Sequence, residues 1–395
     1  MNAPHDGLLV SADYWGAFAV YAVTDRALHG LLPARVHHLL TAIASAAFLW
    51  WFTSIGTKHL FGLYGAILLV YAAANIGPRI PRGLLLVVGS VVVLWMLGKI
   101  GSTFRLGWAS SLFFLGVSFL IVKIWTFAKD LRDGRIEQPD VITFVSYCTY
   151  FPCFVAGPMH FYGEYREGFE KRTALDGATV IEQFWRVLHG LVKVLVVARL
   201  LRPFGLEAIR ELGISQVGPA ELVLRSAVYS LVIYADFSGY SDIVIASTRL
   251  AGVSVPENFQ LPYFARNLRD FWQRWHITFT RFLTRYIFVP VTRALQGRLA
   301  KPSPAKVAAA GYVVTFAFCG VWHGSTPNYL AWGLYHGLGL TVYDAFNRGR
   351  MAKLRQQGRV APARRWSVPL FAAFTFLFVS VGWTLFILPV SFWAR

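Results

Sequence analysis

Long runs of apolar residues recur along the chain and predict helices that cross a membrane. The clearest runs carry almost no charge and cover residues 36–56, 60–77, 84–98, 113–128 and 368–390. One bilayer crossing takes about 20 such residues, so each run predicts a transmembrane helix or most of one. Roughly nine to eleven crossings fit the whole chain, and the shorter runs predict helices that do not cross completely. The expected fold class is an all-α polytopic membrane protein with additional re-entrant or interfacial helices.

The composition favours this fold class over a set of soluble domains. Of the 395 residues, 56% are hydrophobic and 15% are charged, which is typical of polytopic membrane proteins. The net charge of +18 is explained by topology, because Lys and Arg collect in cytoplasmic loops. Segments 292–306 and 347–365 contain basic residues and no acidic one, so both are expected on the cytoplasmic side. We expect membrane lipids as partners of the chain, and no nucleic acid.

The distribution of polar residues predicts how the chain is organised. Residues 1–130 contain few ionisable groups and are expected to be an N-terminal helical scaffold, whereas polar residues interrupt the apolar runs of 131–345, the expected catalytic core. Residues 346–395 hold a basic cytoplasmic loop and the last transmembrane helix. Without repeats or a larger soluble segment, 1–395 is expected to form one membrane-embedded domain. The N-terminus lacks a signal-peptide pattern, which predicts an uncleaved multi-pass protein of the inner (cytoplasmic) membrane.

Several common catalytic arrangements are missing from the sequence. It contains no Gly-rich phosphate loop and no nucleophile elbow. Cys148, Cys153 and Cys319 lie in apolar surroundings without the paired spacing of a zinc site, so they are expected to be buried packing residues. No bound metal and no tightly bound cofactor are expected.

Three segments rich in Gly, Pro, Ser and Asp interrupt the apolar pattern and predict breaks in helices. They are "VAGPMHFYG" at 155–163, "DFSGYSD" at 236–242 and "HGSTPN" at 323–328. The amide and carbonyl groups that a break frees need hydrogen-bond partners, which lipid hydrocarbon does not offer. The breaks therefore predict a cavity that is lined by protein.

The stretch 268–291 predicts one amphipathic helix. Residues at helical spacing fall on two opposite faces, an apolar face with Trp272, His276, Phe279 and Leu283 and a basic face with Arg274, Arg281 and Arg285. Such a helix is too basic to cross a bilayer, so it is expected to lie at the cytoplasmic interface or to dip inward. His276 is then on the buried side, either as part of a site or as a histidine that only bonds a neighbour.

The stretch "CGVWHGSTPNYLAWGLYHG", 319–337, places His323 and His336 in an apolar region. Between the two basic loops the chain must leave the cytoplasmic side and return, and the strong break directly follows His323. The first arm, 307–322, gives about 24 Å of helix at 1.5 Å per residue, so His323 is expected near the apex of a helical hairpin. Intramembrane ionisable residues are costly and suggest function, although a histidine can also brace a broken helix.

Carboxylates form a second group of candidates. Asp236 and Asp242 could serve a proton path or contact substrate, but Asp beside Gly and Ser commonly caps broken helices, and we favour the capping role. His160 and Glu164 stand at helical spacing after a Gly-Pro kink, where a helix end is at least as good an interpretation as a site.

A histidine in surroundings of low polarity tends to stay neutral and able to accept a proton. Neutral histidines beside a cavity therefore suit proton removal from a hydroxyl.

The same motifs, in the same order, resemble the membrane-bound O-acyltransferase (MBOAT) superfamily. The resemblance rests on "YADFSGYSD", on 258–291 with its "RWHIT", and on the "VWHG" of 319–337, and it extends upstream to about residue 114. It is closer to the bacterial branch, which includes the membrane subunits of alginate O-acetylation and teichoic-acid D-alanylation. The resemblance implies a ring of tilted helices with a central tunnel, through which a cytoplasmic thioester donor reaches an acceptor hydroxyl outside.

The resemblance also implies site residues. His323 corresponds to the catalytic histidine, expected to be the general base, and His276 to a second active-site polar residue that orients the thioester or stabilises the oxyanion. We expect seven further residues to line the tunnel or to support these two: Trp322, Trp275, Asn328, Asp236, Asp242, His336 and Arg274. The donor would be acetyl-CoA or the phosphopantetheine of an acyl carrier protein. The acceptor would be an extracytoplasmic polysaccharide or partner protein.

One departure from the family pattern limits what is carried over. Relatives commonly have Arg or another polar pair after Gly-Pro, where this chain has Met159, His160 and Phe161, so an acceptor contact at that place is in doubt. Acetyl and D-alanyl donors stay open as alternatives. A transporter or channel would also use buried His and Asp, but it predicts internal symmetry, and the first half has no second "RWH" or "WHG". An inactive family member that acts as a scaffold is the third alternative.

Overall fold

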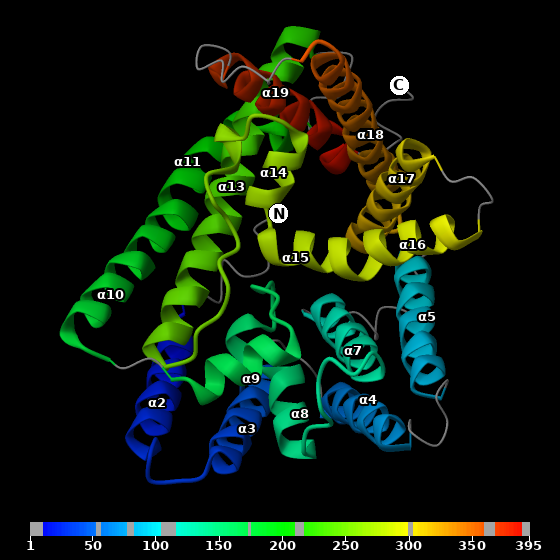
Figure 1. The fold of residues 1–395 in the computed structure, drawn as a ribbon. Helices are drawn as coiled ribbons and strands as arrows, with labels where there is room; N and C mark the ends of the chain where they lie inside the picture. The colour runs from blue at the N-terminus through cyan, green and yellow to red at the C-terminus, as the bar shows by residue number, and fades with distance from the viewer. Residues whose placement is uncertain are drawn as a thin grey trace. The chain divides into compact units, whose positions relative to one another are not determined.

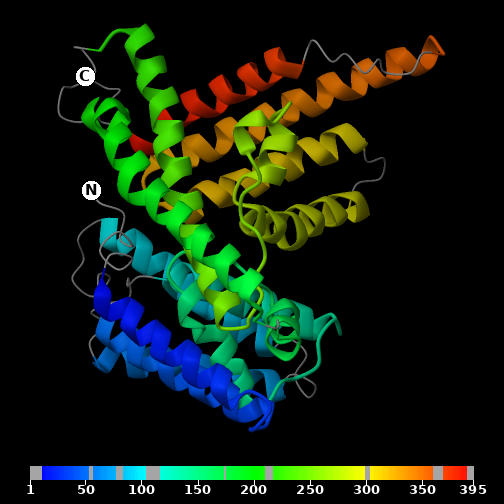
Figure 2. The ribbon, with the colours of Figure 1, turned by 90° about the vertical axis from the view of Figure 1, so that its left-hand side faces the viewer.

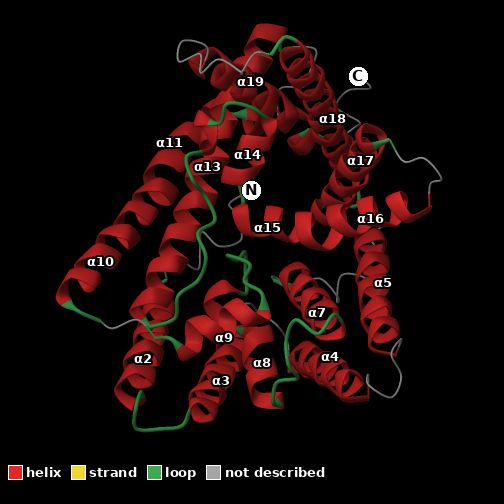
Figure 3. Cartoon of the chain, in the orientation of Figure 1, coloured by secondary structure: helices red, strands yellow, loops and turns green. Residues whose placement is uncertain are grey.

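The described part of the chain is built from helices. The computed structural model describes residues 11–52, 57–76, 83–103, 116–172, 175–209, 217–298, 303–358 and 368–388. Within these ranges Figure 3 shows helices joined by loops and no strand, which confirms the all-α prediction. The residues form two compact units, one from 1–195 with 239–257 and one from 196–238 with 258–395. Helix α13 (Pro219–Leu250) contributes to both.

The first unit contains most of the N-terminal helices labelled in Figure 1. They are α2 (Ala12–Leu28), α3 (Ala34–Phe52), α4 (Thr57–Ile76), α5 (Gly83–Thr103), α7 (Val117–Arg132), α8 (Val141–Thr149), α9 (Tyr162–Glu170) and α10 (Gly177–Val192). The apolar runs predicted between 36 and 128 are confirmed as helices α3, α4, α5 and α7. Helix α8 begins where the Asp140 carboxylate accepts hydrogen bonds from the amides of Ile142 and Thr143, an N-cap that satisfies otherwise free donors.

The predicted break at 155–163 is confirmed. A short 3-10 turn, Phe151–Cys153, is followed by an extended segment, and α9 starts only at Tyr162. His160 therefore precedes the helix, so its expected helical spacing to Glu164 is wrong. The Glu164 side chain instead accepts a hydrogen bond from the Phe161 amide at 3.1 Å, which fixes the helix start. His160 is 2% exposed and stacks on Tyr165, which makes it a core residue of the first unit.

The predicted break at 236–242 is wrong. These residues lie inside α13, which continues without interruption from Pro219 to Leu250. Gly239 serves close packing, because a Cβ there would lie 2.8 Å from the Gly190 carbonyl oxygen of α10. Asp242 does not cap a helix end, because its carboxylate accepts hydrogen bonds from Arg186 at 3.0 Å and Lys193 at 2.7 Å, both on the α10 side of the same unit.

The second unit contains the C-terminal helices. After the π-helical turn Lys193–Ala198, they are α11 (Arg199–Leu201), the first part of α13, α14 (Leu268–Arg274), α15 (Ile277–Phe282), the π-helical turn Leu283–Phe288, α16 (Val289–Arg298), α17 (Pro304–His323), α18 (Pro327–Gln356) and α19 (Val368–Ile387). Figures 1 and 2 show α17 and α18 side by side, with α19 along α18. The predicted hairpin is confirmed, since only Gly324 to Thr326 separate its two arms.

Glycines allow α17 and α18 to pack closely. A Cβ at Gly333 would run into the Phe316 carbonyl, and a Cβ at Gly320 would run into the Tyr329 carbonyl. The two backbones therefore approach so closely that neither position has room for a side chain, as is common between membrane helices. The glycines of the motif thus fix the end of α17, where His323 lies.

Two described helices are long and apolar enough to cross a membrane by length and composition. They are Pro304–His323 and Pro369–Ile387, and shorter apolar helices cover 60–75, 88–99 and 141–153. The expected number of nine to eleven crossings stays a prediction.

Candidate active site

His276 lies at a sharp break between two short helices. Helix α14 ends at Arg274 and α15 begins at Ile277, so the single helix expected over 268–291 is wrong. His276 has a φ of 44°, in the left-handed region, which costs an L-residue about 1–2 kcal/mol. The break is held by Asn258, whose carbonyl oxygen accepts a hydrogen bond from the Ile277 amide at 2.9 Å. The expected burial is confirmed, because His276 is 4% exposed.

The Asn258 side chain determines which nitrogen of His276 carries the proton. Its Oδ1 accepts hydrogen bonds from the Thr278 hydroxyl at 2.9 Å and from the Thr278 amide at 3.4 Å. The same oxygen lies 3.1 Å from Nδ1 of His276, so Nδ1 donates to it. In the neutral ring Nε2 is then an acceptor. This arrangement prepares His276 to receive a proton or a hydrogen bond at Nε2.

His323 is the last residue of α17 and is only partly buried. Its ring is surrounded by aromatic rings at centroid distances of 5.3 Å to Trp332, 5.1 Å to Phe386 and 4.8 Å to Trp322. Directly after it, the Gly324 amide donates back to the Gly320 carbonyl at 3.1 Å, and the helix ends. The aromatic neighbours therefore hold the His323 imidazole in place, while its position at the helix end leaves it partly accessible.

Phe279 brings the two histidines into one site. Its ring centroid lies 5.1 Å from that of His276 and 6.1 Å from that of His323. It also packs on Trp322 at 4.3 Å, which joins α15 to the end of α17. The structure thus collects His276 and His323 around one aromatic ring within the second unit.

His336 is enclosed more completely than either of these histidines. It is 1% exposed, and neither ring nitrogen finds a hydrogen-bond partner among the described residues. Its neighbours are aromatic, with centroid distances of 5.2 Å to Trp272, 5.0 Å to Trp332 and 5.7 Å to Phe378. Trp332 contacts both His336 and His323, so His336 belongs to the wall behind the site.

Three other expected residues support the site by packing. Trp322 is buried and lies on Phe279, and Trp275 is 4% exposed and stacks on Phe271. Asn328 donates a hydrogen bond from Nδ2 to the Phe386 carbonyl at 3.1 Å, which ties the start of α18 to α19. These contacts hold the aromatic walls on both sides of His323.

The remaining expected residues, Asp242, Arg274 and Asp236, lie within ion-pair distance of other charged side chains. Asp242 belongs to the first unit. Arg274 donates to Asp270 at 2.6 Å, on a partly exposed face of α14. Asp236 lies 3.8 Å from the Arg202 guanidinium, although the next residue, Phe237, packs against His276 at 4.8 Å.

Sequence reasoning missed Asn258 and Phe279 as site residues. Phe279 was expected on the apolar face, but its place between two imidazoles depends on the fold. Asn258 lies 18 residues before His276, at a distance for which no spacing rule exists. The available signal was an isolated amide at the start of the segment that carries the family resemblance.

The site provides two imidazoles of different accessibility inside aromatic walls. Among the described residues, no group of three or more His, Cys, Asp or Glu side chains could hold a metal ion. The groups present can accept protons and orient polar atoms in surroundings of low polarity.

A family model decides the class of this protein. The model described as MBOAT, membrane-bound O-acyltransferase family, matches residues 92–385, which include the whole hairpin and both histidines. The chain belongs to this family. Its homologues are named O-acyltransferases, so it is an acyltransferase enzyme, and the transporter and channel alternatives are set aside. A membrane-bound O-acyltransferase transfers acyl groups to hydroxyls, and the matched segment holds both histidines of the candidate site.

Curated relatives of this membrane-bound O-acyltransferase are named for teichoic acid, alginate and peptidoglycan. The chain is 26% identical over 304 residues to the teichoic acid D-alanyltransferase of Streptococcus thermophilus, covering 75% of this chain and 73% of the relative. It is 28% identical over 274 residues to the probable alginate O-acetylase AlgI of Pseudomonas fluorescens, covering 69% of this chain and 50% of the relative. It is also 28% identical over 250 residues to the peptidoglycan O-acetyltransferase of Helicobacter pylori, covering 62% of this chain and 44% of the relative.

Proposed function

We propose that the enzyme moves an acyl group, acetyl or D-alanyl, from a cytoplasmic thioester through the inner membrane to a hydroxyl outside. The acceptor is a cell-envelope polymer or an intermediary protein. The observation that carries this proposal is the pair of imidazoles on Phe279, one buried and one partly exposed at a helix end. The partly exposed His323 can meet an acceptor hydroxyl, while the buried His276 can meet the donor.

In the proposed reaction His323 acts as general base. Its imidazole takes the proton of the acceptor hydroxyl as the oxygen attacks the thioester carbonyl carbon. The carbon–sulfur bond then breaks, the proton passes from the imidazolium to the departing thiolate, and an oxygen ester and a free thiol result. Proton transfer by a positioned side chain contributes about 10²- to 10⁴-fold to such a rate.

The hydrogen bond to Asn258 supports an orienting role for His276. Nδ1 donates to Asn258, so the neutral ring offers Nε2 as an acceptor for an N–H group of the donor, such as a pantetheine amide. Stabilising an oxyanion would require a second proton on the ring, and burial disfavours the charged form of an imidazole. Of the two roles that the family resemblance implies, orientation of the thioester fits this geometry better.

The end of α18 supports a negatively charged donor. Asp344 accepts hydrogen bonds from Arg269 at 2.7 Å and from Arg348 at 2.5 Å, and Arg350 and Lys353 follow without a further acid. Surplus positive charge attracts the phosphates of coenzyme A or the acidic surface of a carrier protein. In the proposed topology this end of α18 faces the cytoplasm, and the thioester travels from there toward His323.

The decisive experiment compares His323→Ala with the wild-type protein in proteoliposomes or native membranes. The probes are radiolabelled acetyl-CoA and a D-alanyl-loaded carrier protein, and the readout is label in the envelope-polymer fraction. We expect transfer to fall by about 10²- to 10⁴-fold. His189→Ala is the matched control, because His189 lies exposed on α10 in the first unit. Unchanged transfer by a correctly inserted His323→Ala protein would overturn the proposal, and the thioester that is consumed identifies the donor.

A further inference from the structure

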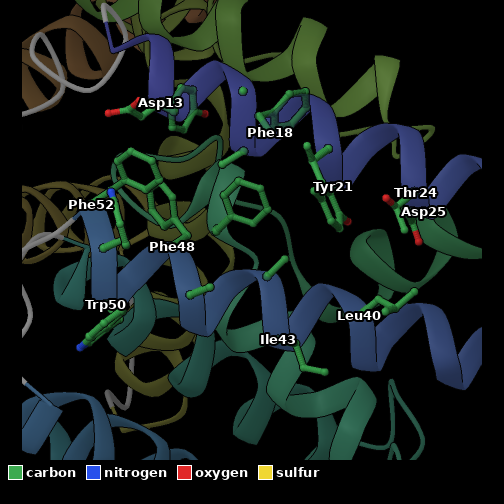
Figure 4. Close-up of a pocket in the computed structure, with 18 of the residues that line it drawn as sticks. Asp13, Phe18, Tyr21, Thr24, Asp25, Leu40, Ile43, Phe48, Trp50 and Phe52 are labelled. Atoms are coloured by element: carbon green, nitrogen blue, oxygen red, sulfur yellow. The ribbon is translucent and has the colours of Figure 1, made fainter.

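A cavity of about 790 Å³ lies between α2 and α3 in the first unit. Figure 4 shows the two helices side by side and labels Phe18, Phe48 and Ile43 among the residues that line the cavity. The lining is apolar along most of its length. Polar side chains stand near its two ends, Asp13 in the first turn of α2 and Asp25 in its last. The hollow therefore suits a long hydrocarbon chain with a polar group at one end.

Asp25, which lines one end of this cavity, belongs to a buried charged cluster. Asp25 is 1% exposed, and its carboxylate accepts hydrogen bonds from His37 Nδ1 at 2.7 Å and from the Arg172 guanidinium. The side chains of His37 and Arg172 are both 3% exposed. Nε2 of His37 and Nη2 of Arg172 are buried and find no hydrogen-bond partner among the described residues. Buried polar atoms of this kind are normally satisfied, so two together point to a missing ligand.

The chemistry of the unpartnered atoms indicates what that ligand carries. A guanidinium N–H can only donate, so Arg172 requires an acceptor oxygen. Asp25 balances the charge of Arg172, and Arg26, which binds the Leu250 carbonyl at 2.8 Å, adds a further positive charge. An anionic oxygen, as in a phosphate group, complements this net positive charge.

The outer faces of the two helices indicate a lipid environment. Large apolar side chains outside the cavity lining are exposed there, including Val23 on α2 and Leu39 on α3. From Arg35 to Trp51, α3 extends about 24 Å at 1.5 Å per residue, which is most of a hydrocarbon layer. A Trp at one end and basic residues at the other match the two interfaces of a bilayer. The charged cluster then lies at headgroup depth and the cavity at acyl-chain depth.

We infer that the cavity binds one anionic glycerophospholipid, with an acyl chain between α2 and α3 and the phosphate against Arg172. A peptide segment is a poorer occupant, because its amide and carbonyl groups would find no partners along an apolar lining. The site lies wholly within the first unit and is independent of the proposed acyl transfer. The lipid completes the packing of α2 on α3 and the hydrogen bonding of the cluster.

The test uses the full-length protein and a pair of glycine variants. Gly16 lines the cavity, and a Cβ there meets nothing within 4 Å, so Gly16→Leu fills the hollow without a clash. Gly65 on α4 has the same open surroundings outside the cavity lining, and Gly65→Leu is the control. Native mass spectrometry counts phosphatidylglycerol retained after delipidation and re-addition. We expect about a tenfold loss of retained lipid for Gly16→Leu and none for Gly65→Leu.

A second comparison tests the headgroup. The double variant Asp25→Asn with Arg172→Gln removes the charged pair without leaving one charge buried alone. Wild-type protein should retain phosphatidylglycerol about tenfold better than diacylglycerol, and the double variant should lose this preference. Equal retention by wild type, Gly16→Leu and Gly65→Leu would overturn the site, as would competition by inorganic phosphate alone. Ala47→Leu, which fills the same cavity from α3, replaces Gly16→Leu if that variant does not fold.

Discussion

Nδ1 of His276 donates a hydrogen bond to Oδ1 of Asn258 at 3.1 Å, and this contact gives the buried imidazole its tautomer and its direction. Asn258 is completely buried and also binds the amide of Ile277 and the hydroxyl of Thr278. The backbone carbonyl of Asn258 thus holds the chain break at which His276 stands, and its side chain holds the imidazole. Site geometry here depends on a residue that performs no chemistry itself.

Replacing Asn258 by Ala should therefore impair catalysis and stability together. The variant removes the oxygen that accepts hydrogen bonds from the Thr278 hydroxyl and from His276 Nδ1, at a cost of about 1–3 kcal/mol in the free energy of unfolding. Misplacement of His276 should lower kcat by about 10²-fold. Thermal unfolding in detergent and the transfer assay measure the two effects.

Asn267→Ala is the control for this variant. Asn267 caps α14 by accepting a hydrogen bond from the Asp270 amide at 2.9 Å, without a contact to His276. Loss of the cap should cost about 1 kcal/mol and leave kcat unchanged. Equal kcat values for the Asn258 and Asn267 variants would contradict the positioning role of Asn258.

His336→Phe should make the protein more stable. Both ring nitrogens of His336 are buried without partners, whereas Phe offers a ring of similar shape to the surrounding aromatic side chains. Removing two unsatisfied polar atoms should raise the free energy of unfolding by about 1–3 kcal/mol. Because His336 belongs to the wall behind the site, the transfer rate should stay unchanged. A stable His336→Phe protein with a raised KM for the donor would instead assign the imidazole to the donor path.

Gly333→Ala should separate α17 from α18 and disturb His323. The added methyl group would collide with the Phe316 carbonyl, and overpacking of this kind costs about 1–3 kcal/mol. Because His323 ends α17, kcat should fall as well. Gly349→Ala on the same helix is the control, since a Cβ there meets open space, and it should raise stability by about 0.5–1 kcal/mol. A Gly333→Ala protein as active and stable as the Gly349 variant would contradict the close-packing argument.

Asp242→Asn should affect stability without affecting catalysis. Asp242 forms ion pairs with Arg186 and Lys193 in the first unit. Because these side chains are partly exposed, the ion pairs contribute about 1 kcal/mol at most to the free energy of unfolding. The melting temperature should fall slightly and the transfer rate per folded protein should stay constant. A large loss of kcat in a stably folded variant would instead give Asp242 a part in the reaction.

Local sequence determined the helical fold class, the apolar helices α3, α4, α5, α7 and α19, and the α17–α18 hairpin. The spacing of apolar residues and the length of an apolar run decide which segments are buried or cross a membrane. The Gly-Ser-Thr-Pro run after His323 cannot continue a helix. The family motif marked His276 and His323 as a pair. These features depend on neighbours along the chain, so the sequence was sufficient for them.

The tertiary structure decided where helices actually break and which polar residues meet. "DFSGYSD" stays helical, because Gly239 packs on α10 and Asp242 pairs with Arg186 and Lys193. The expected helix at 268–291 breaks at His276, because Asn258 supplies the freed amide with a partner. A backbone group can leave a helix only when another group satisfies it, and that partner came from a distant part of the chain. Spacing along the sequence carries no information about such a partner, so only the fold could show it.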